Sequence, residues 1–81
     1  MEKTVEERVK QLIATELAVD IAEVTNNADL EIDLGADSLD RNELICMIED
    51  EFECTIPDEL DDTVKSVADL VKLAENAKRK K

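Results

Sequence analysis

Helix-breaking residues are almost absent from this sequence, which contains one glycine, Gly35, and one proline, Pro57, among 81 residues. Ala, Leu, Glu and Lys are abundant and favour helices over strands. A chain of this length has room for one modest hydrophobic core. We therefore expect one all-α domain that spans residues 1–81.

A capping box and helical spacing define the first long helix. "TVEE" begins at Thr4 and has the Thr-x-x-Glu pattern of a capping box. Apolar residues then recur at helical spacing until about Ala18: Val5, Val9, Leu12, Ile13 and Leu17. The opposite face is charged and should be solvated.

A second helix should run from about Ser38 to Glu53, with Asp37 as its N-cap and Asp40 as a weaker reciprocal partner. One stripe of this helix is apolar and should face the core: Leu44, Ile45, Ile48 and Phe52. The opposite face is mostly carboxylate and should meet partner proteins: Leu39, Asn42, Glu43, Cys46, Glu49, Asp50 and Glu53.

Pro57 suits the first position of a short helical turn through Leu60, and Ser66 with Asp69 marks the start of the last helix. The apolar stripe of the last helix is Val67, Leu70, Val71, Ala74 and Ala77. The final "KRKK", residues 78–81, would place cations at the negative end of its dipole. The predicted fold is a small bundle of three long helices and one short helix.

Residues 19–36 hold too many Asp and Asn residues for a continuous helix, yet they include Ile21, Val24, Leu30, Ile32 and Leu34. We expect a long first loop that packs inward. Loops of this length are usually either functional or misassigned, and the end of this one at the D-S-L stretch favours a function. Alternating acids from Asp29 suggest a calcium loop, but the EF-hand pattern needs glycine at the sixth place, and here glycine is seventh. No specific metal site is predicted, and weak Mg²⁺ or Ca²⁺ binding remains open.

The negative charge is concentrated in the middle of the chain. The formal net charge is −12, and the segment from Asp20 to Asp62 contains 16 acids and one base, Arg41. Nucleic acid is therefore excluded as a partner, because phosphate binding needs clustered Lys and Arg. Basic protein surfaces are the expected partners, drawn in by electrostatic steering.

The absence of histidine excludes several classes of enzyme. Neither a Ser-His-Asp site nor a Cys-His site can form, and two cysteines cannot supply a structural zinc site. Two cysteines are also too few for a disulfide framework, and the sequence contains neither a signal-peptide pattern nor a membrane-length apolar run. We expect a cytoplasmic protein that does not span a membrane and is not an enzyme.

Ser38 stands where a helix N-terminus favours an attached phosphate group, which suits a modification site. An ordinary serine at the start of a helix is the alternative that these residues leave open.

The stretch "DLGADSLDRNELICMIEDEFECTIPDE", residues 33–59, closely resembles the acyl carrier proteins of fatty acid synthesis. The D-S-L motif and the downstream acidic "E-x-E-F…I-P-D-E" pattern have the spacing of that family. The resemblance implies a four-helix carrier bundle, expected as a monomer. It also implies that Ser38, flanked by Asp37 and Leu39, receives 4′-phosphopantetheine from coenzyme A through a Mg²⁺-dependent phosphopantetheinyl transferase.

The resemblance further implies that the thiol of this group holds acyl groups as thioesters and delivers them to synthases and acyltransferases with basic docking patches. The implied docking residues are Asp40, Asn42, Glu43, Cys46, Glu49, Asp50 and Glu53. The acyl chain would fold back into the core between helices. The residues that would line this pocket are Leu30, Leu44, Ile48, Ile56, Val64 and Leu70.

Two departures from the family pattern lie near Ser38. Asn42 replaces a usual Val and Cys46 a usual Met, which removes apolar contact area from the outward face. We therefore expect a specialised carrier for a dedicated synthase or acyltransferase. Polyketide and aminoacyl or peptidyl carriers remain alternatives, as does an unmodified acidic helical adaptor. Arg41 could pair with Asp61 or Asp62, or simply be solvated.

Overall fold

The three long helices begin at the three predicted caps. The computed structural model describes residues 4–57 and 63–79. Within them, α1 spans Val5–Leu17, α2 spans Ser38–Phe52 and α3 spans Val67–Asn76. Their N-caps are Thr4, Asp37 and Ser66, and each forms a complete reciprocal capping box with an acid three residues later. A box satisfies two backbone N–H groups that would otherwise lack partners, so these short signals define where each helix starts.

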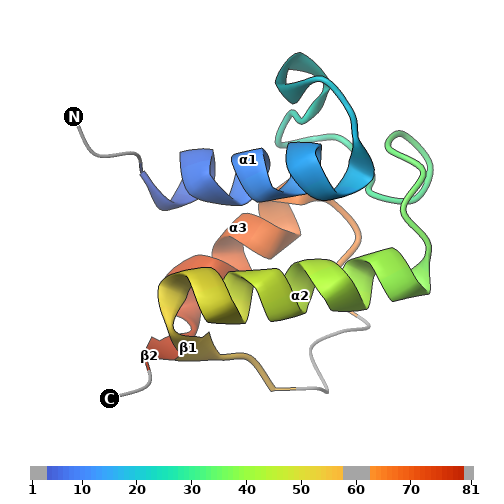
Figure 1. Ribbon diagram of the computed structural model, residues 1–81. Coiled ribbons are helices and arrows are strands. Elements are labelled where there is room, and N and C mark those ends of the chain that lie inside the picture. The colour runs from blue at the N-terminus through green and yellow to red at the C-terminus, as the bar shows by residue number, and fades with distance from the viewer. Residues whose placement is uncertain (1–3, 58–62, 80–81) are drawn as a thin grey trace.

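The helices pack around one apolar core. Figure 1 shows α1 and α2 running side by side with α3 crossing behind them, and α1 contacts both other helices. The predicted stripes of α2 and α3 are buried, except that Ala77 lies beyond the end of α3 and is only partly buried. The predicted all-α bundle is thus confirmed, and the part of the chain that the structure describes contains these three helices and a 3-10 turn, η1, at Ile21–Glu23. The short helix expected at 57–60 lies outside the described residues, apart from Pro57.

The first loop packs inward only in part. Val24, Leu30 and Leu34 are buried as expected, whereas Ile21 is 46% exposed and Ile32 80% exposed, so the prediction was wrong for these two. Residues 29–35 form a helix-like turn in which the Asp33 amide donates to the Asp29 carbonyl and the Gly35 amide donates to the Glu31 carbonyl. In such a turn residues four apart share a side, so Ile32 faces away from Leu30 and Leu34.

The end of the chain departs from the predicted helix. Ala77 has an extended backbone, with φ −67° and ψ 144°, and the chain turns away at that point. Strand β2 (Lys78–Arg79) then pairs antiparallel with β1 (Cys54–Thr55), which follows α2 (Figure 1). Lys78 and Arg79, two of the four residues expected at the negative end of the α3 dipole, thus lie in a strand just beyond the end of the helix, and residues 80–81 lie outside the described residues.

An ion pair joins α1 to the C-terminal end of α2. Arg8 Nη2 lies 2.6 Å from Glu51 Oε2 and donates to the Glu51 carbonyl at 3.3 Å. Its guanidinium also lies 4.4 Å from the centre of the Phe52 ring. No helix within the described residues is both long and apolar enough to cross a membrane.

Candidate functional site

Ser38 is the first residue of α2 and is exposed. The carboxylate of Asp37 accepts a hydrogen bond from the Asp40 amide at 3.0 Å, and that of Asp40 accepts one from the Asp37 amide at 3.2 Å. Both neighbouring acids are therefore engaged in capping. No side chain among the described residues hydrogen-bonds the Ser38 hydroxyl, which is left available at the positive end of the helix dipole.

The turn before α2 is fixed by its own side chains. Asp29 Oδ1 accepts from the amides of Glu31 and Ile32, at 2.9 and 2.8 Å, while Asp33 Oδ2 accepts from the Asp29 amide at 2.8 Å. Gly35 has φ +77°, a region that glycine adopts without steric cost. This turn buries Leu34 on one side and directs the chain into α2, so that Ser38 emerges on the surface.

The same hydrogen bonds already engage acids of the stretch that was considered as a calcium loop. Two of the alternating carboxylates already cap backbone N–H groups. Within residues 4–57 and 63–79, no group of three or more Asp, Glu or Cys side chains could hold a metal ion.

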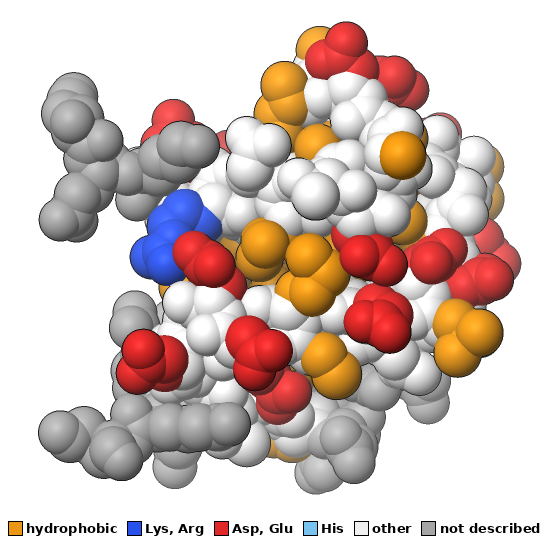
Figure 2. Space-filling view, viewed as in Figure 1, with side chains coloured by type: hydrophobic (Ala, Val, Ile, Leu, Met, Phe, Trp, Pro, Cys, Tyr) orange, Lys and Arg blue, Asp and Glu red, His pale blue; other side chains and the backbone are white. Residues whose placement is uncertain are grey.

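The outward face of α2 is acidic with scattered apolar positions. Figure 2 shows acidic side chains gathered over α2 with hydrophobic side chains between them. Leu39 is 73% exposed, and most of the predicted docking residues are exposed too: Asn42, Glu43, Cys46, Asp50 and Glu53. Asp40 and Glu49 are half-buried, and Glu49 accepts the Ile56 amide at 2.8 Å, so its carboxylate also fixes the chain after α2.

The residues expected to line an acyl pocket come from five separate segments and meet in the core. All six are buried, with exposed fractions between 0 and 4%: Leu30, Leu44, Ile48, Ile56, Val64 and Leu70. They belong to a single apolar cluster that also contains Cys54, whose thiol lies 3.9 Å from the Ile48 carbonyl. Buried polar side chains do not occur within the described residues, so the surroundings of these six residues are apolar.

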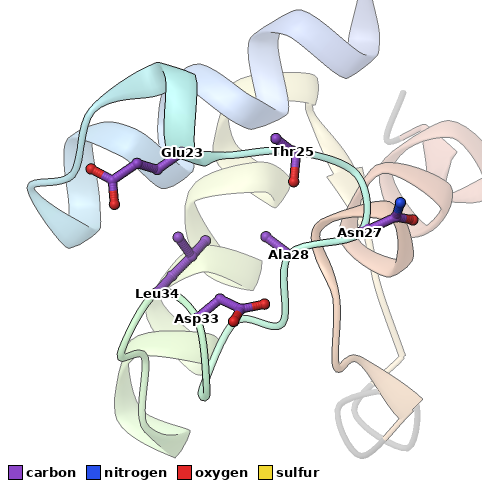
Figure 3. A pocket seen from close by; sticks show the side chains of 6 residues that line it. All are labelled: Glu23, Thr25, Asn27, Ala28, Asp33 and Leu34. Atoms are coloured by element: carbon purple, nitrogen blue, oxygen red, sulfur yellow. The ribbon is translucent and has the colours of Figure 1, made fainter.

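A surface pocket lies elsewhere, beside the first loop (Figure 3). Its volume is about 400 Å³, and it is lined by Glu23, Thr25, Asn27, Ala28, Asp33 and Leu34. Figure 3 shows Glu23 and Asn27 on opposite sides of it, pointing away from each other. This open hollow contains none of the six predicted acyl-contact residues.

Arg41 makes a contact that the sequence did not reveal. Its side chain is half-buried, and Nη1 donates to the Val64 carbonyl at 3.2 Å. Arg41 is therefore not merely solvated, and the acids considered as partners, Asp61 and Asp62, lie outside the described residues. In the sequence, the position of Arg41 at the start of the core-facing stripe was the sign that its side chain would be partly buried. Its hydrogen-bond acceptor could not be predicted, because that acceptor is a backbone carbonyl 23 residues away, which any residue type would supply.

This arrangement presents an alcohol and lacks the means to activate it. A carboxylate engaged in capping is too weak a base to ionise Ser38, and the sequence contains no histidine. The site is suited to being modified by an external enzyme that brings its own base. A phosphate ester on Ser38 would fit, because the first turn of α2 directs backbone N–H groups towards it.

Comparison with known proteins gives an independent result. A family model described as a phosphopantetheine attachment site matches residues 7–74. The solution structure of the apo doublet acyl carrier protein from prodigiosin biosynthesis is similar, with a TM-score of 0.78 at 20% sequence identity. The similarity covers 94% of this chain and 37% of that one, so this chain spans little more than a third of its length.

Proposed function

The chain belongs to the family of proteins with a phosphopantetheine attachment site, and we propose that it is an acyl carrier protein modified at Ser38. Members of this family are carriers rather than catalysts, and phosphopantetheinyl transferases modify them. The observation that carries the proposal is the exposed Ser38 hydroxyl at the first turn of α2, inside the matched residues. The sequence contains one other serine, Ser66, whose Oγ accepts the Asp69 amide at 3.3 Å.

The residues around Ser38 prepare this position for 4′-phosphopantetheine. The capping box of Asp37 and Asp40 holds the first turn, so the N–H groups beside Ser38 stay oriented towards a phosphate. Leu39 is exposed beside the serine and offers an apolar contact to the transferase. When bound, the group supplies a terminal thiol that holds acyl groups as thioesters.

The acidic face of α2 supports docking on synthases and acyltransferases with basic patches. Exposed carboxylates at Glu43, Asp50 and Glu53 give long-range attraction, which raises association rates more than affinity. A carrier that visits several enzymes needs such weak and rapid contacts. The six buried residues named above support a core that expands to admit the acyl chain.

Loading by a transferase tests the assignment of Ser38. Purified protein is incubated with coenzyme A, Mg²⁺ and a broad-specificity phosphopantetheinyl transferase, and its intact mass is measured. Wild-type protein and Ser66→Ala should gain one phosphopantetheine, whereas Ser38→Ala should gain none. Ser66→Ala is the matched control because it alters the other serine at a helix start. An unchanged wild-type mass would favour the unmodified acidic adaptor, and a loaded Ser38→Ala variant would refute the site.

We also propose that the chain serves a dedicated pathway rather than general fatty acid synthesis. Asn42 and Cys46 are both exposed on the docking face, where the resemblance leads us to expect Val and Met. The smaller apolar area of Asn and Cys at these two positions weakens docking on enzymes whose surfaces fit Val and Met.

A standard fatty acid synthase set tests the pathway. The loaded wild type should elongate acyl groups more slowly than the double variant Asn42→Val, Cys46→Met, by about tenfold if roughly 1.4 kcal/mol of apolar burial is restored. Equal rates would remove the case for specialisation. Polyketide and aminoacyl or peptidyl carriers are distinguished in a separate assay, because each of those requires its own loading enzyme.

A further inference from the structure

We propose that Arg41 controls the passage of an acyl chain from Ser38 into the core, an inference that rests on the proposed carrier function. In this role Arg41 is a positioning residue, because it touches the backbone that must move.

Arg41 lies between the attachment residue and the core along α2. Positions three and four apart share one face of a helix, so Arg41 belongs to the stripe that continues with Leu44, Ile45 and Ile48. Ser38 lies three residues before Arg41 and is exposed, whereas Leu44 lies three residues after it and is 0% exposed. A chain that descends from Ser38 to Leu44 along this face must pass Arg41.

The guanidinium of Arg41 joins α2 to the segment that precedes α3. Its Nη1 atom lies 3.2 Å from the carbonyl oxygen of Val64, whose side chain is fully buried. On its other side this segment is held by the first loop. The Leu30 amide donates to the Lys65 carbonyl at 2.8 Å, and the Val67 amide donates to the Ala28 carbonyl at 3.1 Å.

Backbone pairing thus fixes this segment to the first loop, and the Arg41 side chain ties it to the first turns of α2. Within the described residues, Leu44 and Ile48 of α2 belong to the same buried apolar cluster as Val64, in this segment, and Leu70 of α3. Separating α2 from this segment requires release of the Val64 carbonyl by Arg41. An arginine suits such a contact, because its apolar stem covers buried surface while its charged end returns to water when displaced.

The occupant this predicts is an unbranched acyl chain long enough to extend past Arg41 into the apolar cluster. A two-carbon acyl group remains outside and leaves the Arg41 contact in place, whereas an eight-carbon chain gains burial only when the contact opens. Burial of the acyl chain opposes the charge-assisted hydrogen bond between Arg41 and the Val64 carbonyl. The balance of these two free energies therefore sets the acyl-chain length at which the thioester becomes protected from solvent.

Hydrogen exchange in the unmodified protein tests the contact without any loading. The probe is the Leu30 amide, whose acceptor is the residue next to Val64, and the Ile13 amide in α1 is the internal reference. The ratio of the Leu30 rate to the Ile13 rate should rise about fivefold in Arg41→Gln, because the Gln side chain is two atoms shorter and uncharged and so loses the hydrogen bond to the Val64 carbonyl. The ratio should stay unchanged in Arg8→Gln, which removes a different arginine that joins α1 to α2.

The rate at which the thioester of the loaded protein is cleaved tests whether Arg41 controls the entry of the acyl chain into the core. Octanoyl and acetyl forms are treated with hydroxylamine, and the cleavage rates are compared by mass spectrometry. The octanoyl form of Arg41→Gln should be cleaved about fivefold more slowly than that of wild type, with acetyl forms equal. Arg8→Gln should behave as wild type, and Arg41→Lys, which keeps the positive charge and most of the side-chain length, should lie between wild type and Arg41→Gln.

The outcomes separate the two proposals. An unchanged exchange ratio in Arg41→Gln overturns the inference whether or not the protein can be loaded. A raised ratio with equal octanoyl cleavage in wild type and Arg41→Gln also overturns it, because the contact would then be purely structural. Failure to load Ser38 refutes the proposed function, and the exchange ratio still judges the Arg41 contact on its own.

Discussion

The two serines of this chain differ by one position relative to a helix start, and this difference decides what their hydroxyls do. Ser66 is an N-cap, so its Oγ accepts a backbone N–H of its own helix. Ser38 follows an N-cap, because Asp37 fills that role, and its hydroxyl stays exposed. The side chain of an N-cap residue is occupied by its hydrogen bond to the helix backbone, whereas the side chain of Ser38, one position later, makes no such bond and faces solvent. Asp37 therefore leaves the Ser38 hydroxyl exposed at the surface.

Asp69 gives a prediction about pH. Its carboxylate accepts the Lys65 amide at 2.9 Å and the Ser66 amide at 3.1 Å, and the Lys65 bond is the main cause that lowers the pKa of Asp69. A group whose pKa is lower when folded stabilises the fold above its unfolded pKa, about 3.9. That stabilisation is lost as the pH falls through the folded pKa.

The comparison of wild type with Asp69→Asn measures this effect. Wild type should melt at the higher temperature at pH 6, and the difference should shrink as the pH falls from about 5 to 3. Circular dichroism at 222 nm is the suitable readout, because the chain contains no Trp or Tyr. A difference that stays constant over this range would mean that the bonds to Asp69 contribute little.

At the scale of elements, the helix starts were predictable and the end of the last helix was not. Each start depends on two residues three apart in sequence, and all three boxes form as predicted. The end of α3 depends instead on pairing between Lys78–Arg79 and Cys54–Thr55, which are far apart along the chain. Short strands of two residues carry no periodic signal, so the sequence could not indicate them.

The contact between α1 and α2 gives a second prediction. Arg8→Gln should lower the free energy of unfolding by about 1 kcal/mol, because it removes an exposed ion pair to Glu51 and a cation–π contact with Phe52. Lys10→Gln is the matched control. It breaks the pair with Glu6 on α1 alone and should change stability much less.

Urea unfolding followed by circular dichroism measures both variants. Equal destabilisation by Arg8→Gln and Lys10→Gln would contradict a specific role for the contact between the two helices.

At the scale of the whole molecule, negative charge opposes folding. The formal net charge is −12, and the described residues form two ion pairs, Arg8 with Glu51 and Lys10 with Glu6. Many carboxylates therefore repel one another on a small surface, which favours docking on basic partners and weakens the isolated fold. The acidic surface that suits a carrier thus has a cost in stability.

Salt should relieve this repulsion. Raising NaCl from about 10 to 200 mM shortens the screening length from roughly 30 to below 10 Å, and the melting temperature should rise by on the order of 5 °C. Millimolar Mg²⁺ should have a similar effect at low NaCl. An unchanged melting temperature in both titrations would show that the carboxylates are farther apart than their density in the sequence implies.

The sequence by itself determined the three helix starts, the buried stripes of α2 and α3 and the concentration of acids, because these depend on neighbours along the chain. It also contained the motif around Ser38 that indicated the family. Only the tertiary structure decided that Ile21 and Ile32 are exposed and that Arg41 bonds Val64. Those features depend on segments that meet only when the chain has folded, and a backbone carbonyl can accept a bond whatever side chain it carries.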